Sequence, residues 1–106
     1  MITLEDFKKA DIRIGKVVSA EKVKGADKLL KLEVDIGSEK RQIITGMAEF
    51  YEPSHFVGKE LPLLLNLEYK QFKGLESQGM ILAADVDGKP VLLHPKREVP
   101  AGSVVK

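Results

Sequence analysis

The most distinctive chemistry in the sequence lies between residues 66 and 84. Two lysines (Lys70 and Lys73), two aromatic residues (Tyr69 and Phe72) and several amides follow one another in this segment. Cations bind phosphates, flat rings stack on bases and amides form hydrogen bonds with base edges, so the combination is typical of a surface that binds single-stranded nucleic acid. A plain hairpin with Phe72 in the core and solvated lysines would have the same composition, so both interpretations stay open.

Hydrolytic chemistry and metal binding find little support in the sequence. Cysteine is absent, which excludes disulfides and thiolate metal sites. The only histidines, His55 and His94, have no nucleophile beside them and no spacing typical of a zinc site, and we expect both in exposed loops. Gly74, Gly79 and Gly88 lack the context of a phosphate-binding loop. We therefore predict a chain that is not itself an enzyme and has no catalytic residue, metal or cofactor.

The charges are unevenly distributed although their sum is nearly balanced. Lysine and arginine number 17 and aspartate and glutamate 16, which excludes a uniformly basic nucleic-acid binder. Residues 8–31 nevertheless contain eight basic and three acidic residues, an excess of +5. This segment could form a positive surface for phosphate, or its lysines could simply cover solvated strands.

A length of 106 residues and a hydrophobic fraction of 43% indicate one globular domain, residues 1–106. The longest apolar run, residues 61–67, is interrupted by Pro62 and Asn66 and is too short to cross a bilayer. No signal sequence opens the chain, so we expect a cytoplasmic protein without a membrane partner.

The hydrophobic periodicity predicts a short helix followed by five strands. Residues 3–10 are expected to form the helix, capped by Thr3, with Leu4 and Phe7 on one face that packs against the rest of the protein. Strands are expected over residues 11–23, with a bend or bulge at Gly15, and over residues 30–36, 41–45, 60–67 and 78–85. Residues 47–59 are expected to form a short helix or irregular connector, and Asp87-Gly88 a hairpin turn into residues 90–93.

Five short strands with a helical connector between the third and fourth are the pattern of an oligonucleotide/oligosaccharide-binding (OB) barrel. We therefore predict an all-β fold with small helices, namely a five-stranded OB barrel with an N-terminal helix and a C-terminal extension. Other small barrels and sandwiches have the same number of strands. The apolar extension after Val86 is not needed by such a barrel, so we expect it to seal one end of the barrel or a subunit interface.

Three segments, DIRIGKVVSAEKVKGADKLLKLEVDIG, RQIITG and NLEYKQFKGLESQGMILAA, resemble in order and spacing the tRNA-binding domain appended to methionyl-tRNA synthetases. The same domain resembles free-standing structure-specific tRNA-binding proteins, the C-terminal domain of some tyrosyl-tRNA synthetases and a bacterial secretion chaperone. The resemblance extends from about Asp11 to Val105, nearly the whole chain. It implies a homodimeric OB barrel that binds tRNA by its shape rather than by anticodon sequence.

The resemblance also implies which residues face the RNA: Lys28, Arg41, Asn66, Lys73, Ser77 and Met80. The cations would meet phosphates, the amide and the hydroxyl would form hydrogen bonds, and the methionine would contact a base or ribose. Asn66 and Ser77 could instead have structural roles, and Met80 could fill the core. Tyr69 stands where the family often has proline and Gln71 where it often has a basic residue, so the path of this loop stays open.

The combined interpretation is an accessory domain or subunit that serves methionyl-tRNA synthetase in protein biosynthesis. It would raise the effective concentration of tRNA near a catalytic domain through weak, salt-sensitive contacts. The dimer interface is expected to combine the N-terminal helix with the C-terminal apolar segment. One alternative is a peptide-binding secretion chaperone of the same family, which would need neither the +5 segment nor Lys73. A second alternative is a dimerisation domain whose RNA contacts are vestigial.

Overall fold

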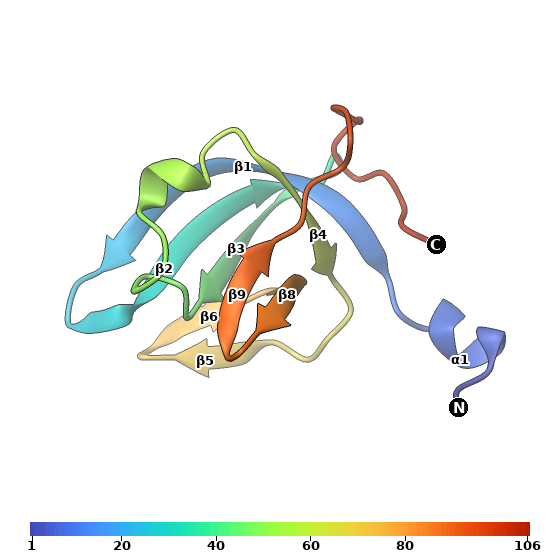
Figure 1. Ribbon diagram of the computed structural model, residues 1–106, viewed down its shortest axis with the longest axis horizontal. Helices are drawn as coiled ribbons and strands as arrows, with labels where there is room; N and C mark the ends of the chain where they lie inside the picture. Colours follow the sequence, from blue (N-terminus) through green and yellow to red (C-terminus); the bar gives the residue numbers. More distant parts are fainter.

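The computed structural model describes residues 1–106 and is built around a strongly curved antiparallel sheet (Figure 1). Its elements are α1 (Leu4–Lys8), β1 (Ile12–Val23), β2 (Ala26–Asp35), β3 (Lys40–Thr45), the 3-10 helix η1 (Pro53–His55), β4 (Glu60–Leu64), β5 (Lys70–Phe72), β6 (Leu75–Ser77), β7 (Met80–Ile81), β8 (Ala83–Val86) and β9 (Lys89–Leu92). Five strands form one sheet in the order β3-β2-β1-β4-β7, while β5–β6 and β8–β9 are separate hairpins. This strand-rich architecture agrees with the predicted OB-like barrel. No helix has the length and apolarity that crossing a bilayer requires.

The long strand β1 pairs with two neighbours, as its length predicts. Its first half pairs with β4 and its second half with β2, so the strand bends between the two partners. The bulge lies between Val17 and Ser19 and not at Gly15, where it was expected. A Cβ atom at Gly15 would stand 2.5 Å from side-chain carbons of Val34 and Leu63. Gly15 is therefore required by the close packing beneath β1 and not by a bulge.

One hydrophobic cluster fills the barrel. Its members alternate along the strands as a half-buried sheet requires, and Phe56 follows η1 and plugs the cluster with no exposed surface. The twelve buried residues are Val17, Leu30, Leu32, Val34, Ile36, Ile43, Met47, Phe56, Leu61, Leu63, Leu65 and Ile81.

The barrel is closed by polar side chains between β3 and residues 76–78. The Gln78 backbone N–H donates to the Gln42 carbonyl (2.8 Å), and the Gln42 N–H donates to Gln78 Oε1 (3.0 Å). The Ile44 N–H donates to Oγ of Ser77 (3.0 Å), and this hydroxyl donates to the Gly79 carbonyl (3.0 Å). Because Gln42, Ser77 and Gln78 form hydrogen bonds where a fifth strand pairing would otherwise close the barrel, they join the two edges of the sheet.

Ser77→Ala is expected to lower the free energy of unfolding by about 1–3 kcal/mol, because the buried Ile44 N–H would lose its acceptor. Urea unfolding followed by circular dichroism measures this loss. Ser38→Ala is the matched control, since Ser38 is exposed in the loop after β2 and should change stability by less than about 0.5 kcal/mol. Equal stability of the two variants would contradict a closing role for Ser77.

The C-terminal segment covers the edge of β1 that β2 leaves free. The Ile14 N–H donates to the Ser103 carbonyl (2.8 Å), the Gly102 N–H to the Ile14 carbonyl (2.7 Å) and the Val105 N–H to the Ile12 carbonyl (2.8 Å). Gly102 has φ +90°, and a Cβ atom there would collide with the Ile36 carbonyl. The extension therefore covers a strand edge of the barrel, and truncation at Val86 would expose that edge.

Several local predictions differ from the structure. Helix α1 has the predicted cap, with Asp6 N–H donating to Thr3 Oγ1 (3.1 Å), but it has no buried residue, and Leu4 and Phe7 remain 66% and 37% exposed. The strand expected over residues 30–36 begins earlier, at Ala26, the strand expected over residues 60–67 ends at Leu64, and that over residues 78–85 is divided into β7 and β8. The loop expected before it contains the hairpin β5–β6.

Candidate nucleic-acid interface

Two neighbouring hairpins carry cations that have no carboxylate partner. Eight of the basic side chains form ion pairs with carboxylates, mostly on the strand faces. Lys24, Lys28, Lys70 and Lys73, which we call the hairpin lysines, form none; they belong to the β1–β2 hairpin and the β5–β6 hairpin. An unpaired, exposed ammonium group keeps its full charge available for a phosphate.

A pocket of ≈ 570 Å³, which we call the hairpin pocket, lies between the β1–β2 hairpin and the β5–β6 hairpin. It is lined by residues 25–29 on one side and by Gln71, Phe72 and Lys73 on the other. Lys28 and Lys73, two of the predicted RNA-binding residues, therefore line the same pocket. Phe72 is 38% exposed, so its ring is accessible. The alternative in which Phe72 belongs to the hydrophobic core is therefore wrong. Cations beside an exposed ring offer both phosphate binding and base stacking.

The backbone holds Lys73 in an unusual conformation. Lys73 has φ +53° and Gly74 has φ +80°, and the flanking Phe72 and Leu75 are paired, so the two residues form a type I′ hairpin turn. Asn or Asp is preferred at the first position of this turn because other residues are strained at positive φ. The lysine at this position therefore costs stability, and it places a charge at the tip of the hairpin.

Lys73→Asn is expected to raise stability while lowering affinity for RNA. Asn relieves the left-handed strain, so the free energy of unfolding should rise by roughly 0.5–1 kcal/mol. Loss of the charge should weaken RNA binding about eightfold at 0.1 M salt, if Lys73 neutralises one phosphate. Urea unfolding and an RNA titration measure the two effects. Lys106→Asn removes one unpaired charge outside any turn and should change neither quantity appreciably.

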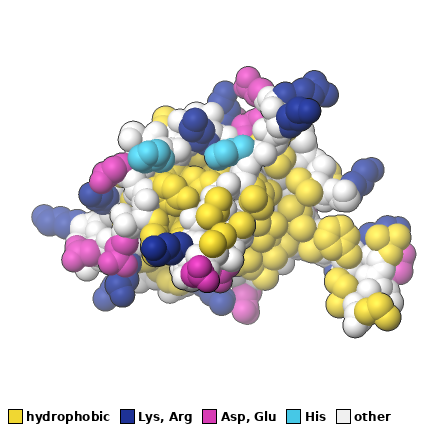
Figure 2. All heavy atoms as spheres, viewed as in Figure 1, with side chains coloured by type: hydrophobic (Ala, Val, Ile, Leu, Met, Phe, Trp, Pro, Cys, Tyr) yellow, Lys and Arg dark blue, Asp and Glu magenta, His cyan; other side chains and the backbone are white.

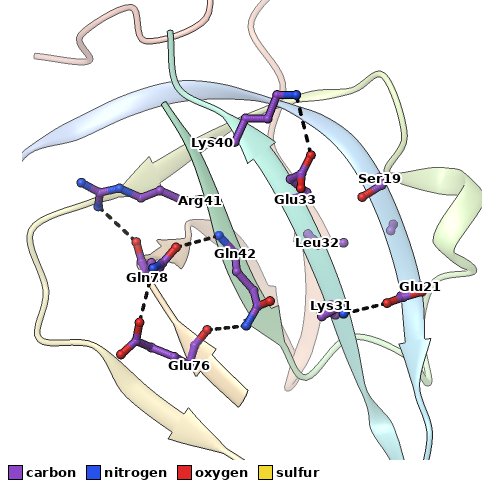
Figure 3. A pocket seen from close by; sticks show the side chains of 11 residues that line it. Ser19, Glu21, Lys31, Leu32, Glu33, Lys40, Arg41, Gln42, Glu76 and Gln78 are labelled. Atoms are coloured by element: carbon purple, nitrogen blue, oxygen red, sulfur yellow. Dashed lines mark hydrogen bonds and ion pairs between the residues drawn. The ribbon is translucent and has the colours of Figure 1, made fainter. Parts of the chain in front are cut away.

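Arg41 is engaged inside the chain and projects into a different pocket from Lys28 and Lys73. Its Nη1 donates to the carbonyls of Leu65 (2.7 Å) and Gln78 (3.1 Å), and its guanidinium lies 5.9 Å from the centre of the Tyr69 ring. Figure 3 shows the polar pocket beside it, of ≈ 520 Å³, over β1, β2 and β3. The lysines of this pocket pair with glutamates, so its charges are largely neutralised internally.

Asn66 and Ser77 are likewise bonded to backbone groups. Asn66 Oδ1 accepts from the Asp11 N–H (2.7 Å) and its Nδ2 donates to the Lys9 carbonyl (2.6 Å), so the amide fastens the segment after α1 to the end of β4. Ser77 is 4% exposed, and its hydroxyl accepts from the Ile44 N–H and donates to the Gly79 carbonyl where the barrel closes. Both residues stabilise the backbone that carries the hairpins.

Met80 lies beside the hairpin pocket. Its side chain is 44% exposed and lines a small pocket of ≈ 130 Å³ together with Phe72, Ser77 and Lys70. Because Phe72 lines both pockets, the ring connects Met80 to the site of Lys28 and Lys73.

Lys24 was not singled out as a site residue by the sequence, because only the arrangement of partners shows which lysines have no carboxylate nearby.

The two histidines are exposed, as predicted, and lie apart from any metal-binding group. His55 belongs to η1, and the Nδ1 atom of His94 lies 2.8 Å from the Glu60 carbonyl. No group of three or more His, Asp or Glu side chains is arranged to hold a metal ion.

A family model described as "Putative tRNA binding domain" matches residues 12–104. The chain is 56% identical over 104 residues to a methionine–tRNA ligase of Archaeoglobus fulgidus, covering 98% of this chain and 16% of that protein. It is 50% identical over 107 residues to a methionine–tRNA ligase of Clostridium tetani, covering 99% of this chain and 17% of that protein. The chain thus spans about a sixth of the length of these relatives.

Two solved structures have the same fold over the whole chain. A MetRS-related protein from Pyrococcus horikoshii superimposes with a TM-score of 0.96 at 40% identity, covering 100% of this chain and 98% of that one. The chaperone CsaA from Bacillus anthracis superimposes with a TM-score of 0.90 at 30% identity, covering 100% and 99%.

Proposed function

Because the chain belongs to the tRNA-binding domain family related to methionyl-tRNA synthetases, we propose that it binds tRNA by shape, without reading sequence, on behalf of a methionyl-tRNA synthetase. The observation that carries the proposal is that Lys28 and Lys73, from two different hairpins, line one pocket together with the exposed ring of Phe72. No step of aminoacylation is assigned to this chain, which would act as an accessory domain or subunit.

Direct contacts are assigned to the exposed residues of the hairpin pocket. Lys28 and Lys73 would bind phosphates, and Met80 together with Phe72 would cover a base or ribose. Arg41, Asn66 and Ser77 keep their place in the site as positioning residues, since their polar atoms hold the backbone from which the hairpins extend. Phosphate contacts fix where the RNA lies but do not read its sequence, which suits a module that recognises folded tRNA.

Such contacts would assist a synthetase by tethering. A weak, salt-sensitive grip on the body of the tRNA raises its effective concentration at a catalytic site on the same assembly. The affinity of the isolated chain can therefore be modest without loss of this effect.

We also propose that two chains associate through α1 and the neighbouring apolar surface. Leu4 is 66% and Phe7 37% exposed although they share one helix face. Figure 2 shows apolar side chains spread across the face that carries β8 and β9 and again on the projecting helix. Val86, Val91 and Leu93 contribute to this exposed surface. Apolar area of this extent is typical of a protein interface.

The proposed function is tested by titrating the chain with a folded tRNA and with an unstructured RNA of equal length over a series of salt concentrations. Preference for the folded tRNA, with an affinity that falls as salt rises, is the expected result. The slope of log affinity against log salt estimates how many phosphates are neutralised. Equal binding of both RNAs, or no binding at low salt, would contradict the proposal.

The similarity to CsaA makes a peptide-binding chaperone the second candidate, since that chaperone covers the whole chain at 30% identity. The exposed apolar face would then bind extended peptide. A competition experiment separates the two candidates: an unfolded peptide displaces tRNA only if both occupy one surface. Binding of the peptide without any binding of tRNA would favour the chaperone.

A further inference from the structure

A second group of unpaired cations lies away from the hairpin pocket. Lys59, Lys96 and Arg97 form no ion pair, and all three line one pocket of ≈ 380 Å³. The pocket lies where the C-terminal segment passes the junction of β1 and β4, and none of its lining residues is shared with the hairpin pocket. We propose that this second pocket binds a phosphate group.

The walls of the pocket suit a charged, hydrated ligand. No hydrophobic residue lines it, and its cations outnumber its carboxylates four to two. One carboxylate is occupied, because Lys16 Nζ lies 3.3 Å from Glu98 Oε1. The other, Glu60, is 7% exposed, and its Oε1 accepts from the Val99 N–H (2.9 Å). Lys59, Lys96 and Arg97 therefore face the pocket without a carboxylate within ion-pair distance.

The buried Glu60 carboxylate does not fill the role of a counter-ion for these cations. Its Oε2 is buried without a partner, and no lysine or arginine forms an ion pair with it. The carboxylate instead accepts from the Val99 N–H, and the backbone carbonyl of Glu60 contacts His94 Nδ1, so Glu60 holds both ends of the segment 94–99 that forms the wall of the pocket. Cations that share a pocket repel one another, and a phosphate anion relieves this repulsion through charge-assisted hydrogen bonds.

His94 provides a probe inside the site. A carbonyl oxygen only accepts hydrogen bonds, so Nδ1 of His94 carries a hydrogen and donates it in a hydrogen bond to the backbone carbonyl of Glu60. The Nε2 atom of His94 has no partner in the chain. The ring is part of the pocket wall, whereas His55, the only other histidine, lies on η1 outside it. The two imidazole resonances therefore report the site and a reference in the same sample.

The phosphate could belong to the backbone of the bound tRNA or to a free small molecule, and two arms of one experiment distinguish these sources. In the first arm, inorganic phosphate is added at constant pH and ionic strength, with sulfate-free chloride buffer as reference. We expect the proton resonances of His94 to move saturably and those of His55 to stay in place. In the second arm, which rests on the proposed function, tRNA binding is measured over a salt series.

The Lys96→Gln/Arg97→Gln variant is compared with Lys89→Gln/Lys106→Gln, which loses the same charge at unpaired lysines outside both pockets. The first variant should lose the His94 response to phosphate, and the second should keep it. If the site holds an RNA phosphate, the first variant should also lower the salt slope by up to about two, since each removed cation neutralises at most about one phosphate. An unchanged slope with a retained phosphate response in the control would assign the site to a free phosphate compound.

A wild-type His94 resonance that does not respond to phosphate or to tRNA would overturn the proposal. Failure of the proposed function gives a different result: tRNA does not bind, and the response of His94 to inorganic phosphate still shows whether the second pocket binds phosphate. The Lys28→Gln/Lys73→Gln variant separates the two sites further, since it should weaken tRNA binding and leave the His94 response to phosphate intact.

Discussion

The Lys28→Gln/Lys73→Gln variant is expected to bind tRNA about 60-fold more weakly than the wild type at 0.1 M salt, if each lysine neutralises one phosphate. Each such contact contributes a slope of about 0.9 in log affinity against log salt, so the slope should fall by about two. Lys28 and Lys73 line one pocket from two hairpins and have no carboxylate partner. No other cation lines this pocket, so nothing replaces their positive charge when they are removed. Filter binding or fluorescence anisotropy over a salt series measures both quantities.

Glutamine keeps the length and polarity of the lysine side chain, and both residues are exposed, so the fold should be unaffected. Lys89→Gln/Lys106→Gln has the same change in net charge and controls for long-range attraction. A 60-fold loss in the control variant as well would assign the effect to overall charge and not to the hairpin pocket.

The Leu4→Gln/Phe7→Gln variant is expected to be a monomer under conditions where the wild type is a dimer. A two-fold interface uses each residue twice, so four apolar side chains would leave water. Burial of a fully exposed side chain of this size is worth about 1.5–3 kcal/mol, and Leu4 and Phe7 are 66% and 37% exposed, so their loss should raise the dissociation constant at least about a hundredfold. Light scattering or sedimentation equilibrium at micromolar concentration measures the change of mass.

Glu5→Gln/Lys8→Gln is the matched control because it alters the polar residues of the same helix and conserves the net charge. The capping box of Thr3 and Asp6 is kept in both variants, so the helix should form in each. A dimer that survives Leu4→Gln/Phe7→Gln would place the interface elsewhere, and the apolar face of β8 and β9 would be the next surface to alter. Truncation is unsuitable, since residues 102–105 complete the edge of β1.

Strands with regular alternation could be predicted from the sequence, and irregular ones could not. The β1 and β3 strands and the β8–β9 turn follow the predicted pattern closely, because period-two alternation and Asp87-Gly88 are local signals, whereas β2 begins four residues before its predicted start. The strands after Leu64 could not be predicted from alternation, because the two short strands of the hairpin β5–β6 have no buried side except near Ser77. Their pairing is directed by the type I′ turn at Lys73-Gly74, in which lysine is an uncommon first residue.

The candidate site divides in the same way. Lysine and an aromatic ring in one segment indicated a nucleic-acid surface, and the structure adds that Lys28 from a hairpin over 40 residues earlier lines the same pocket. A structural role for Asn66 and Ser77 was one alternative, but the partners of Arg41, Asn66 and Ser77 could not be predicted, because each residue bonds a backbone group at least 24 residues away. Spacing along the chain contains no signal for such contacts.

The two ends of the chain lie on the same side of the molecule, and the β1–β2 turn lies toward the opposite end of its 41 Å long axis (Figure 1). A fluorophore or spin label attached at Met1 or Lys106 would therefore stand beside α1 and far from the hairpin lysines. Pairs of such labels on two chains would report association between the chains and would be little quenched by bound RNA. Labels placed at the β1–β2 turn would have the opposite sensitivity, so the two positions together separate the order in which association and RNA binding occur.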